Sequence, residues 1–315
     1  MAKKDLAYFK KRFARIAYYV RETFALKKPV AKAESLLKHI EVTPELKQRV
    51  DYCCKIKTPF TVSKQATRNQ DFAKTKSFVY FADLKRIVRH FPKNFYFDYI
   101  FGDVIDVPET PSFVKSRPIV ENNDNAVLLK LNAIRHYQFF EDSQAFSEKR
   151  PQAVWRGMVY HQHRRDFVDM YHDKPFADVG HNDEKRADEP SYKGFMSVAE
   201  QLTFRYIVSV EGKDVATNLK WAMASNSLVM MRKPRFETWF MEGRLEPGVH
   251  YVELKDDFSD LEEKVQFYNL PENQDKALQI IANAHAYVAQ FKDSDQELLV
   301  SLLVAQKYFD MQAAR

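Results

Sequence analysis

The sequence predicts an α/β protein with two domains and an N-terminal helical extension. Strand and helix patterns alternate regularly after Pro151, as expected for a parallel sheet covered by helices. Residues 58–150 mix strand-like runs with a helix, which predicts a second, smaller α/β domain. A chain of 315 residues is long enough for two domains that each bury a core.

The alternation in the second half defines each expected element by its apolar run. Strands are expected at residues 153–155, 176–179, 206–210 and 228–231 and near 249–254. Helices are expected at residues 164–172, 197–204, 215–224, 257–269, 274–291 and 296–311. Because ligands of such sheets lie past the carboxyl ends of the strands, the turns that follow these strands are candidates for the site.

The first half is less regular. Residues 1–57 read as helices with breaks at prolines. Strands are expected at 78–81, 95–101 and 126–131, with a helix near 82–90. Residues 103–125 are rich in Pro, Asp and Asn and lack periodicity, which predicts a long loop, and long loops in compact domains are commonly functional.

The expected domain boundaries follow from these patterns. They are a basic helical extension (1–57), an α/β domain (58–150), a second α/β domain (151–292) and a C-terminal helix that packs back toward the N-terminal domain (293–315). Asp293 and Asp295 open that last helix, where acids at the N-cap favour the helix dipole.

The positive charge of the chain is local. Residues 1–28 hold nine Lys or Arg and two acids, a net charge of +7, whereas the rest holds 40 basic and 41 acidic residues, a net charge of −1. The basic segment also has helical periodicity, with apolar residues three or four apart: Leu6, Phe9, Phe13, Ile16, Val20 and Phe24.

Two interpretations of this segment remain open. A basic amphipathic helix can lie on an anionic bilayer, in which case residues 3–26 contact the membrane. Alternatively, it packs its apolar face on the body and leaves its basic residues in solvent. In either case its positive face, including Lys10, Lys11, Arg12 and Arg15, can attract a membrane or an anionic acceptor.

Several classes of protein are disfavoured. Cys53 and Cys54 are adjacent and badly placed to bridge each other, and no Cys/His cluster has zinc spacing. No apolar run approaches the roughly 20 residues of a membrane span, and the charged N-terminus lacks the apolar core of a secretory signal. We therefore expect a cytoplasmic protein.

Glycine positions give an independent indication of the site. The chain has only seven glycines, and Gly102, Gly157 and Gly212 each follow an expected strand, where the backbone turns sharply or approaches a ligand. The glycine patterns of dinucleotide and P-loop sites are absent from the sequence, which disfavours those two enzyme classes.

An ordered series of motifs resembles glycosyltransferase family 90, which includes lipopolysaccharide core glycosyltransferases, capsule xylosyltransferases and protein O-glucosyltransferases. The series covers roughly residues 95–290. Within the family, the bacterial branch is the most similar. The motifs are Lys115-Ser-Arg-Pro118, Leu128-Leu-Lys-Leu-Asn132, Arg135-His136, Ala153-Val-Trp-Arg-Gly157, Arg165-Asp166, Val210 to Trp221, Ser225 to Val229, Trp239-Phe240, Pro247 to Tyr251 and Phe258 to Leu261.

The resemblance implies a GT-B fold, in which two Rossmann-like domains face each other across a cleft. It also implies that the C-terminal domain holds the nucleotide, that the anomeric carbon is inverted, and that no metal or other cofactor is needed. The implied reaction moves glucose or galactose from a UDP-sugar to a sugar hydroxyl of lipopolysaccharide or lipooligosaccharide core. The enzyme would work in the cytoplasm, peripherally on the inner membrane.

The resemblance also assigns roles to residues. Asp106, two residues before Pro108, matches the general base, with Asp103 as competitor. Arg165 matches the arginine on the diphosphate. The remaining implied nucleotide-sugar residues are Arg156, Gly157, Gly212, Thr217, Asn218 and Lys220.

This sequence departs from the family pattern in places. Ala216 and Asn218 stand where many members have Ser and Arg, and Met158 stands where a small or hydroxyl residue is usual. His161 and His163 flank the first turn and are interpreted as surface residues.

Three alternatives to a lipopolysaccharide core glycosyltransferase remain open. One is a family 90 transferase with another donor, such as xylose, or with a capsule or protein acceptor. Another, of a different class, is a basic nucleic-acid-binding protein, which the confinement of charge to 28 residues disfavours. The third is a membrane-bound scaffold without activity.

Overall fold

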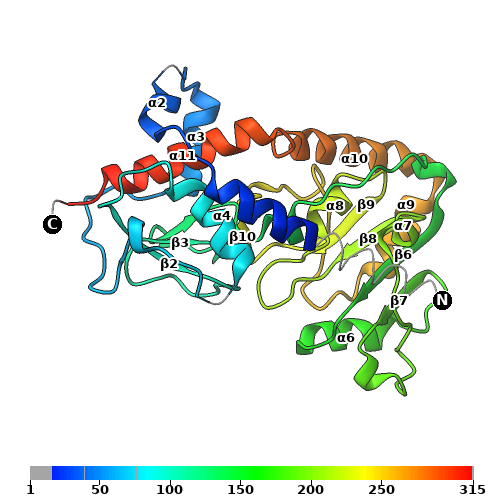
Figure 1. The fold of residues 1–315 in the computed structure, drawn as a ribbon. Helices are drawn as coiled ribbons and strands as arrows, with labels where there is room; N and C mark the ends of the chain where they lie inside the picture. Colours follow the sequence, from blue (N-terminus) through cyan, green and yellow to red (C-terminus); the bar gives the residue numbers. More distant parts are fainter. Residues whose placement is uncertain (1–15, 39, 76, 314–315) are drawn as a thin grey trace. The chain divides into compact units, whose positions relative to one another are not determined.

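The computed structural model describes residues 16–38, 40–75 and 77–313, which form two compact units (Figure 1). The first unit holds the described residues within 1–134, 236–241 and 293–315. The second unit holds residues 135–235 and 242–292. Both contain parallel strands and helices, so the chain is a mixed α/β protein. The boundaries of the functional domains that the sequence predicts, at residues 57/58, 150/151 and 292/293, stay a prediction.

The first unit is built on a sheet of strand order β1-β2-β3-β5. Strands β2, β3 and β5 are parallel, and β1 is antiparallel to β2. A second, two-stranded sheet pairs β4 with β10 antiparallel. The bounds are β1 (Thr67–Arg68), β2 (Tyr96–Ile100), β3 (Ser112–Val114), β4 (Ser116–Pro118), β5 (Ala126–Leu128) and β10 (Phe236–Thr238).

Helices cover this sheet and close its core. They are a helix over residues 16–27, α2 (Ala33–Leu37), α3 (Pro44–Cys53), α4 (Phe78–Val88), the short α5 (Ala133–His136), the 3₁₀ turn η1 (Asn69–Asp71) and α11 (Ser294–Asp310). Helix α11 packs against α2, α3 and α4. Its Tyr308 and Phe309 meet Phe97 and Phe113 of the sheet, with the Tyr308 and Phe113 ring centroids 4.3 Å apart. Asp293 caps α11 by accepting from the Asp295 and Gln296 amides, which confirms the predicted N-cap.

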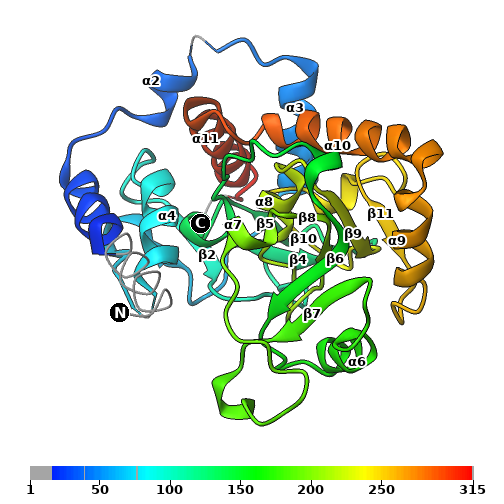
Figure 2. The ribbon, with the colours of Figure 1, turned by 90° about the vertical axis from the view of Figure 1, so that its right-hand side faces the viewer.

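The second unit is built on a parallel sheet of strand order β11-β9-β8-β6-β7 (Figure 2). Its strands are β6 (Arg150–Gly157), β7 (Ala177–His181), β8 (Phe204–Ser209), β9 (Leu228–Arg232) and β11 (Val252–Leu254). The chain leaves β6 toward β7 on one side, and then crosses back to β8, β9 and β11 on the other. The topological switch point therefore lies between β6 and β8.

Helices flank both faces of this sheet. They are α6 (Gln162–Tyr171), α7 (Val198–Gln201), α8 (Leu219–Met223), α9 (Leu261–Asn269), α10 (Gln274–Ala289) and the 3₁₀ turns η2 (Phe146–Glu148), η3 (Glu184–Arg186), η4 (Glu242–Arg244) and η5 (Pro271–Asn273). Helix α6 packs on β7, α9 on β6, and α10 on α8 and β9. The core between them includes Trp155, Phe167, Tyr206 and Phe258.

Residues 236–241 leave the second unit and complete the first. Arg117 Nε of β4 donates to Glu237 Oε1 of β10 (2.8 Å), and both side chains are buried. Arg117 also donates to the carbonyls of Ala126 and Tyr52, and the Tyr52 hydroxyl donates to the other Glu237 oxygen. The buried charges of Arg117 and Glu237 are thus paired only when residues 236–241 are folded into the first unit.

The predicted strand and helix alternation after Pro151 is confirmed, with α7 and α8 shorter than expected. Two predictions for the first half are wrong. The run Phe78–Phe81 is the first turn of α4, because its aromatic and β-branched residues pack as a helix against the sheet. The predicted loop at 103–125 contains β3 and β4, because β3 is buried on both faces and so shows no alternation.

Candidate active site

The switch point of the second unit brings together the two turns singled out in the sequence. The first, residues 158–161, follows β6, and the second, residues 210–218, follows β8. Because β6 and β8 are neighbours and parallel, both turns leave the same edge of the sheet. In doubly wound sheets this is the place where ligands bind.

Arg164 ties the two turns together. Its Nε donates to the Glu211 carbonyl (2.8 Å) and its Nη2 to the Val210 carbonyl (2.7 Å), both in the second turn. Its Nη1 donates to the Met158 carbonyl (3.2 Å) in the first turn. The guanidinium lies over the ring of Trp155, 5.6 Å from the centroid. Arg164 therefore sets the spacing between the turns.

Positive charge concentrates around this edge. Burial, together with the nearby Arg135, lowers the pKa of Arg164 to about 10. Arg235 and Arg232 approach the carboxylate of Glu211 at 2.9 and 3.8 Å. These cations make the edge of the sheet suited to an anionic ligand.

His163 also belongs to this edge, contrary to its interpretation as a surface residue. Its Nε2 lies 2.8 Å from the Glu211 carbonyl, in hydrogen-bonding contact. Burial lowers the pKa of His163, and the neighbouring arginines add to this effect against the opposing bond to Glu211. The ring is therefore neutral near pH 7, and it helps Arg164 hold the second turn.

The predicted residues of the second turn lie as follows. Asn218 donates from Nδ2 to the Val208 carbonyl (2.9 Å) and so fixes the start of α8. The Thr217 hydroxyl accepts from Arg135 at 3.4 Å. A Cβ on Gly212 would lie 3.4 Å from the Arg164 guanidinium, so a side chain there would crowd that contact.

Lys220 lies apart from this edge. Its side chain is buried in α8, and its Nζ donates to Glu242 Oε1 (2.5 Å). The pair gives Lys220 a structural role in the free protein.

Arg156 points along the sheet toward β7. Its Nη2 donates to Asp178 Oδ1 (2.8 Å), and Lys193 lies 3.3 Å from the same oxygen. Burial would raise the pKa of Asp178, but these two cations outweigh it and lower that pKa.

A Cβ on Gly157 would lie 2.8 Å from the Trp155 ring, so glycine is required there for space.

Arg165 lies about 100° around α6 from Arg164. Its Nε donates to the Val159 carbonyl (2.9 Å). It lines a polar pocket of about 380 Å³ together with Asp169, His172, His181, Arg186 and Glu189. The buried His181 lies 3.2 Å from Glu189 across this pocket. The two adjacent arginines thus serve different surfaces.

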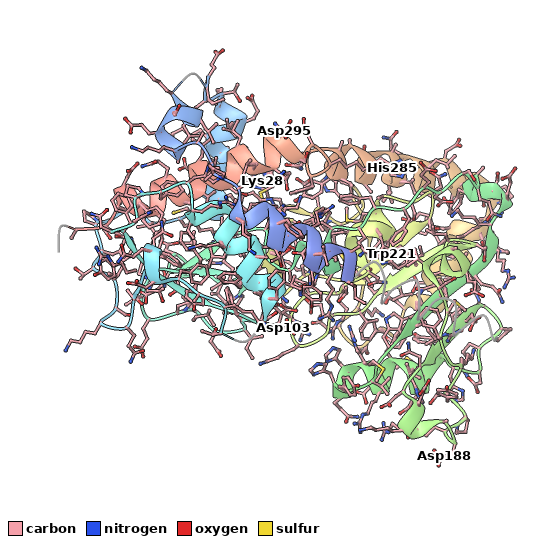
Figure 3. The ribbon with its side chains drawn as sticks, in the orientation of Figure 1. Lys28, Asp103, Asp188, Trp221, His285 and Asp295 are labelled. Carbon is pink, nitrogen blue, oxygen red and sulfur yellow. The ribbon has the colours of Figure 1, made fainter. Side chains whose placement is uncertain are left out.

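In the first unit, the two candidate bases follow β2. Gly102 has a φ of +107°, a conformation that L side chains rarely adopt, and it turns the chain into Asp103 (Figure 3). Lys115 Nζ, almost fully buried, donates to Asp103 Oδ1 (2.5 Å). Asp106 is exposed and has no hydrogen bond or ion pair within the part of the chain that the structure describes. The two carboxylates therefore differ in environment.

The motif Lys115-Ser-Arg-Pro118 anchors this segment. Lys115 pairs with Asp103, and the Val104 amide donates to the Ser116 hydroxyl (3.0 Å), which in turn donates to the Val104 carbonyl (3.1 Å). Arg117 holds β10 as described above. The motif therefore fixes the backbone between the two aspartates to the core of the unit.

Some expectations fall elsewhere. Lys10, Lys11, Arg12 and Arg15 lie outside the described residues. Within the described ranges, no cluster of three or more His, Cys, Asp or Glu side chains could hold a metal ion. None of the described helices is both long and apolar enough to cross a membrane.

The two units together define an α/β protein, and the edge of the parallel sheet at its switch point is a candidate ligand site. The chain belongs to glycosyltransferase family 90, whose description, "Glycosyl transferase family 90", applies to residues 130–312. The O-glucosyltransferase LpsA of Dichelobacter nodosus is 47% identical over 272 residues, which are 86% of this chain and 85% of that protein.

More distant relatives cover less of the chain. Protein O-glucosyltransferase 3 of Homo sapiens is 27% identical over 53% of this chain and 33% of its own length. Protein O-glucosyltransferase 3 of Rattus norvegicus is 26% identical over the same shares. The predicted family is thus confirmed, and the chain is a glycosyltransferase. Among the classes considered from the sequence, the finding favours an enzyme over a nucleic-acid-binding protein or a scaffold.

Sequence reasoning missed Arg164 and the anchoring role of Lys115. A signal for Arg164 was present, because it precedes the buried Phe167, Val168 and Tyr171 by three, four and seven residues. That spacing places it on the buried side of α6.

Proposed function

We propose that this enzyme transfers a hexose, glucose in the first instance, from a UDP-sugar to a sugar hydroxyl of lipopolysaccharide or lipooligosaccharide core. The main support for donor binding by the second unit is that Arg164 bridges the two turns at the switch point of its sheet. The glucose assignment draws on the bacterial relative, which is named as an O-glucosyltransferase. Galactose is the alternative hexose.

The donor diphosphate would lie over the turns after β6 and β8. A departing UDP carries negative charge, which the cations around Arg164 and Arg135 would stabilise. The first amides of α6, a helix of 10 residues without a side-chain cap, would add donors. Arg165 would reach the diphosphate from the neighbouring side. Gly212 and Thr217 would let the backbone of the second turn approach it.

The acceptor half would come from the first unit, in the GT-B arrangement. Asp106 would take the proton of the acceptor hydroxyl as that oxygen attacks the anomeric carbon from the face opposite the UDP. The bond to UDP then breaks, and the configuration inverts. Asp106 suits this role better than Asp103, because Lys115 already neutralises Asp103. No metal would be needed, because the arginines supply the positive charge.

The place of action would be the cytoplasmic face of the inner membrane. The acceptor core is anionic and anchored in that membrane, and the basic N-terminal segment, residues 3–26, would draw the enzyme to it. The enzyme would bind peripherally.

A panel of tritiated UDP-sugars with truncated core oligosaccharides as acceptors tests this function. Transfer from UDP-glucose, abolished in Asp106→Asn and retained in part in Asp103→Asn, is the expected result. Retained UDP binding by both variants in calorimetry would show that they fold. Absence of transfer from every UDP-sugar by the wild type would refute the proposal.

A second candidate keeps the chemistry and changes the acceptor. The human and rat relatives are named as protein O-glucosyltransferases, which favours including folded protein acceptors and UDP-xylose in the same panel. Transfer to protein but not to core oligosaccharide would select this candidate.

A further inference from the structure

The helix over residues 16–27 docks on the first unit by its polar side. The Tyr18 hydroxyl donates to Asp83 Oδ1 of α4 (3.2 Å), and Arg86 of α4 pairs with the buried Glu22. Arg89 Nη1 donates to the Ala25 carbonyl (2.9 Å) near the end of the helix. Polar contacts thus hold this helix on α4.

Its apolar side faces outward. Ile16, Val20 and Phe24 are 49%, 51% and 64% exposed. Spaced four residues apart, they form one continuous line along the helix, called here the outer stripe. A helix of a globular protein normally buries its apolar stripe and exposes its polar face. In this helix Tyr18 and Glu22 are buried, whereas the three aliphatic or aromatic side chains of the outer stripe are exposed, so the stripe is suited to an apolar medium outside the unit.

Positive charge flanks the outer stripe. Lys27 and Lys28 are exposed, and 72% of the Arg21 side chain is exposed. The whole segment of residues 1–28 carries nine basic residues and two acids. An apolar line bordered by cations is the pattern of helices that lie in the interface of an anionic bilayer.

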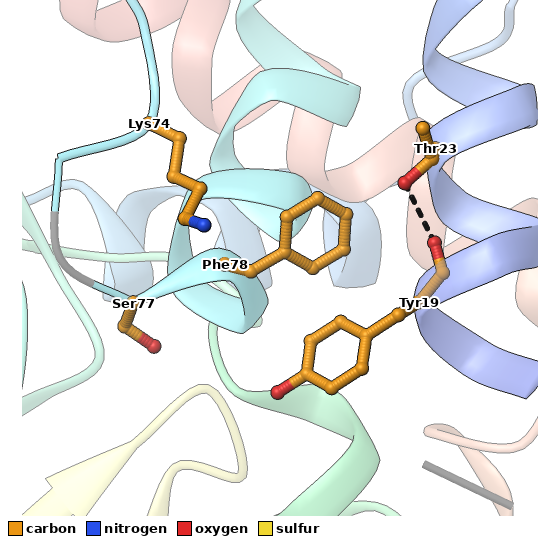
Figure 4. Close-up of a pocket in the computed structure, with 5 residues that line it drawn as sticks. All are labelled: Tyr19, Thr23, Lys74, Ser77 and Phe78. Atoms are coloured by element: carbon orange, nitrogen blue, oxygen red, sulfur yellow. Dashed lines mark hydrogen bonds between the residues drawn. The ribbon is translucent and has the colours of Figure 1, made fainter. Parts of the chain in front are cut away.

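A pocket of about 880 Å³ opens between this helix and the start of α4 (Figure 4). Tyr19 and Thr23 line it from the helix, and Lys74, Ser77 and Phe78 line it from the start of α4. The Tyr19 and Phe78 rings meet edge to face, with centroids 5.0 Å apart. Aromatic rings, hydroxyls and an ammonium group together match the depth at which lipid headgroups meet acyl chains.

We propose that the outer stripe inserts into a bilayer that contains anionic phospholipid, with Lys74 at the lipid phosphates. The inference deepens the membrane part of the proposed function by naming the face that binds. A second copy of the chain is a poorer occupant, because pairing two such stripes would bring their cations together. Three side chains also offer far less apolar area than a stable dimer buries.

Docking through α4 gives this face a fixed orientation. The contacts of Tyr18 and Glu22 lie on the side opposite the stripe, so the helix can enter the interface without leaving the unit. Membrane binding and folding of the first unit are therefore separable, which allows a clean test.

The test is co-sedimentation of the full chain with vesicles of phosphatidylcholine alone and of phosphatidylcholine mixed with phosphatidylglycerol. The wild type should bind only the anionic vesicles. Val20→Ser and Phe24→Ser should each weaken binding about tenfold, the equivalent of half-burying such a side chain. Lys74→Gln should weaken binding to a smaller degree.

Matched controls are Leu270→Ser and Leu278→Ser in the second unit, whose wild-type side chains are 46% and 48% exposed. They should bind vesicles as the wild type does. Because all four apolar residues are exposed, the urea midpoints of the serine variants should equal that of the wild type.

Binding by the stripe variants at wild-type strength would overturn the inference, as would equal binding of the wild type to both kinds of vesicle. Turnover with a soluble acceptor, measured on the same preparations, keeps the two proposals apart. Vesicle binding with this pattern but no turnover would remove the proposed transfer reaction and leave the docking face standing.

Discussion

Replacing Arg164 by Met should impair donor use more than it impairs folding. The substitution keeps the aliphatic stem near Trp155 but removes the three hydrogen bonds to the Met158, Val210 and Glu211 carbonyls. The turns after β6 and β8 then lose their common tie. Under the proposed function, both turns position the diphosphate.

The magnitude follows from these contacts. Hydrogen bonds to charged groups contribute roughly 1.5–3 kcal/mol each. Water can replace Arg164 at carbonyls on an open edge, so the net loss in unfolding free energy should fall below the sum of the three bonds. We expect a loss of about 2–4 kcal/mol in unfolding free energy. A displacement of about 1 Å in positioning groups lowers rates about 10²-fold, so kcat/KM for the UDP-sugar should fall by that factor.

Arg205→Met is the matched control. Arg205 also donates to a carbonyl, that of Ser147 (2.8 Å), and lies over a ring, that of Phe146, but it sits near the amino end of β8. Urea unfolding and initial rates with UDP-glucose should show lower stability for both variants and lower kcat/KM for Arg164→Met alone. Equal activity of the two variants would refute the positioning role.

Three further predictions concern Asp83, Lys220 and Gly157. Burial raises the pKa of Asp83 to about 6, so its contribution to stability is full below about pH 4 and is lost as the pH rises through 6. The unfolding free energy of Asp83→Asn relative to wild type should therefore rise by about 2–3 kcal/mol between pH 4 and 7.5 in urea titrations, and a pH-independent difference would contradict this. Lys220→Met should lose about 3–5 kcal/mol in unfolding free energy by removing the ammonium group that pairs with the buried Glu242 carboxylate, whereas the double variant with Glu242→Leu should recover most of it. If that double variant also keeps the wild-type KM for UDP-sugar, Lys220 does not bind the nucleotide. Gly157→Ala should lower the thermal midpoint, by about 1–3 kcal/mol in free energy, because its Cβ would meet the Trp155 ring, and an unchanged midpoint would contradict the crowding.

The sheet of the second unit was predictable because its strands are buried on both faces. Val154, Ile207 and Val229 lie in register on three neighbouring strands, each within an apolar run. Parallel buried strands show such runs between helical patterns, so neither alternation nor long-range information is needed to find them.

The first unit was less predictable because its contacts are distant in sequence. The run Phe78–Phe81 has the composition of a strand, and only packing against the sheet makes it helical. Strand β10 contributes three residues whose partner, β4, lies more than 100 positions earlier, as in the pair Glu237 and Arg117. No pattern in the local sequence of either strand predicts a pairing over such a distance along the chain.

In the candidate site, the sequence indicated the turns but not the side chains that shape them. Arg164 and Arg165 are adjacent, and one residue along a helix turns a side chain by about 100°. The family resemblance pointed to Arg165, whereas the phase of α6 puts Arg164 between the turns. For the N-terminal helix, the periodicity found the apolar line, but only the contacts of Tyr18 and Glu22 show which side docks.

The chain passes between the two units four times, before Arg135, Phe236, Glu242 and Asp293. During synthesis, the first unit therefore lacks β10 and α11 until residues 236–241 and 294–310 have been added. Neither unit corresponds to a continuous stretch that could be expressed alone. The first unit can therefore complete its fold only after every residue of the second unit has been synthesised.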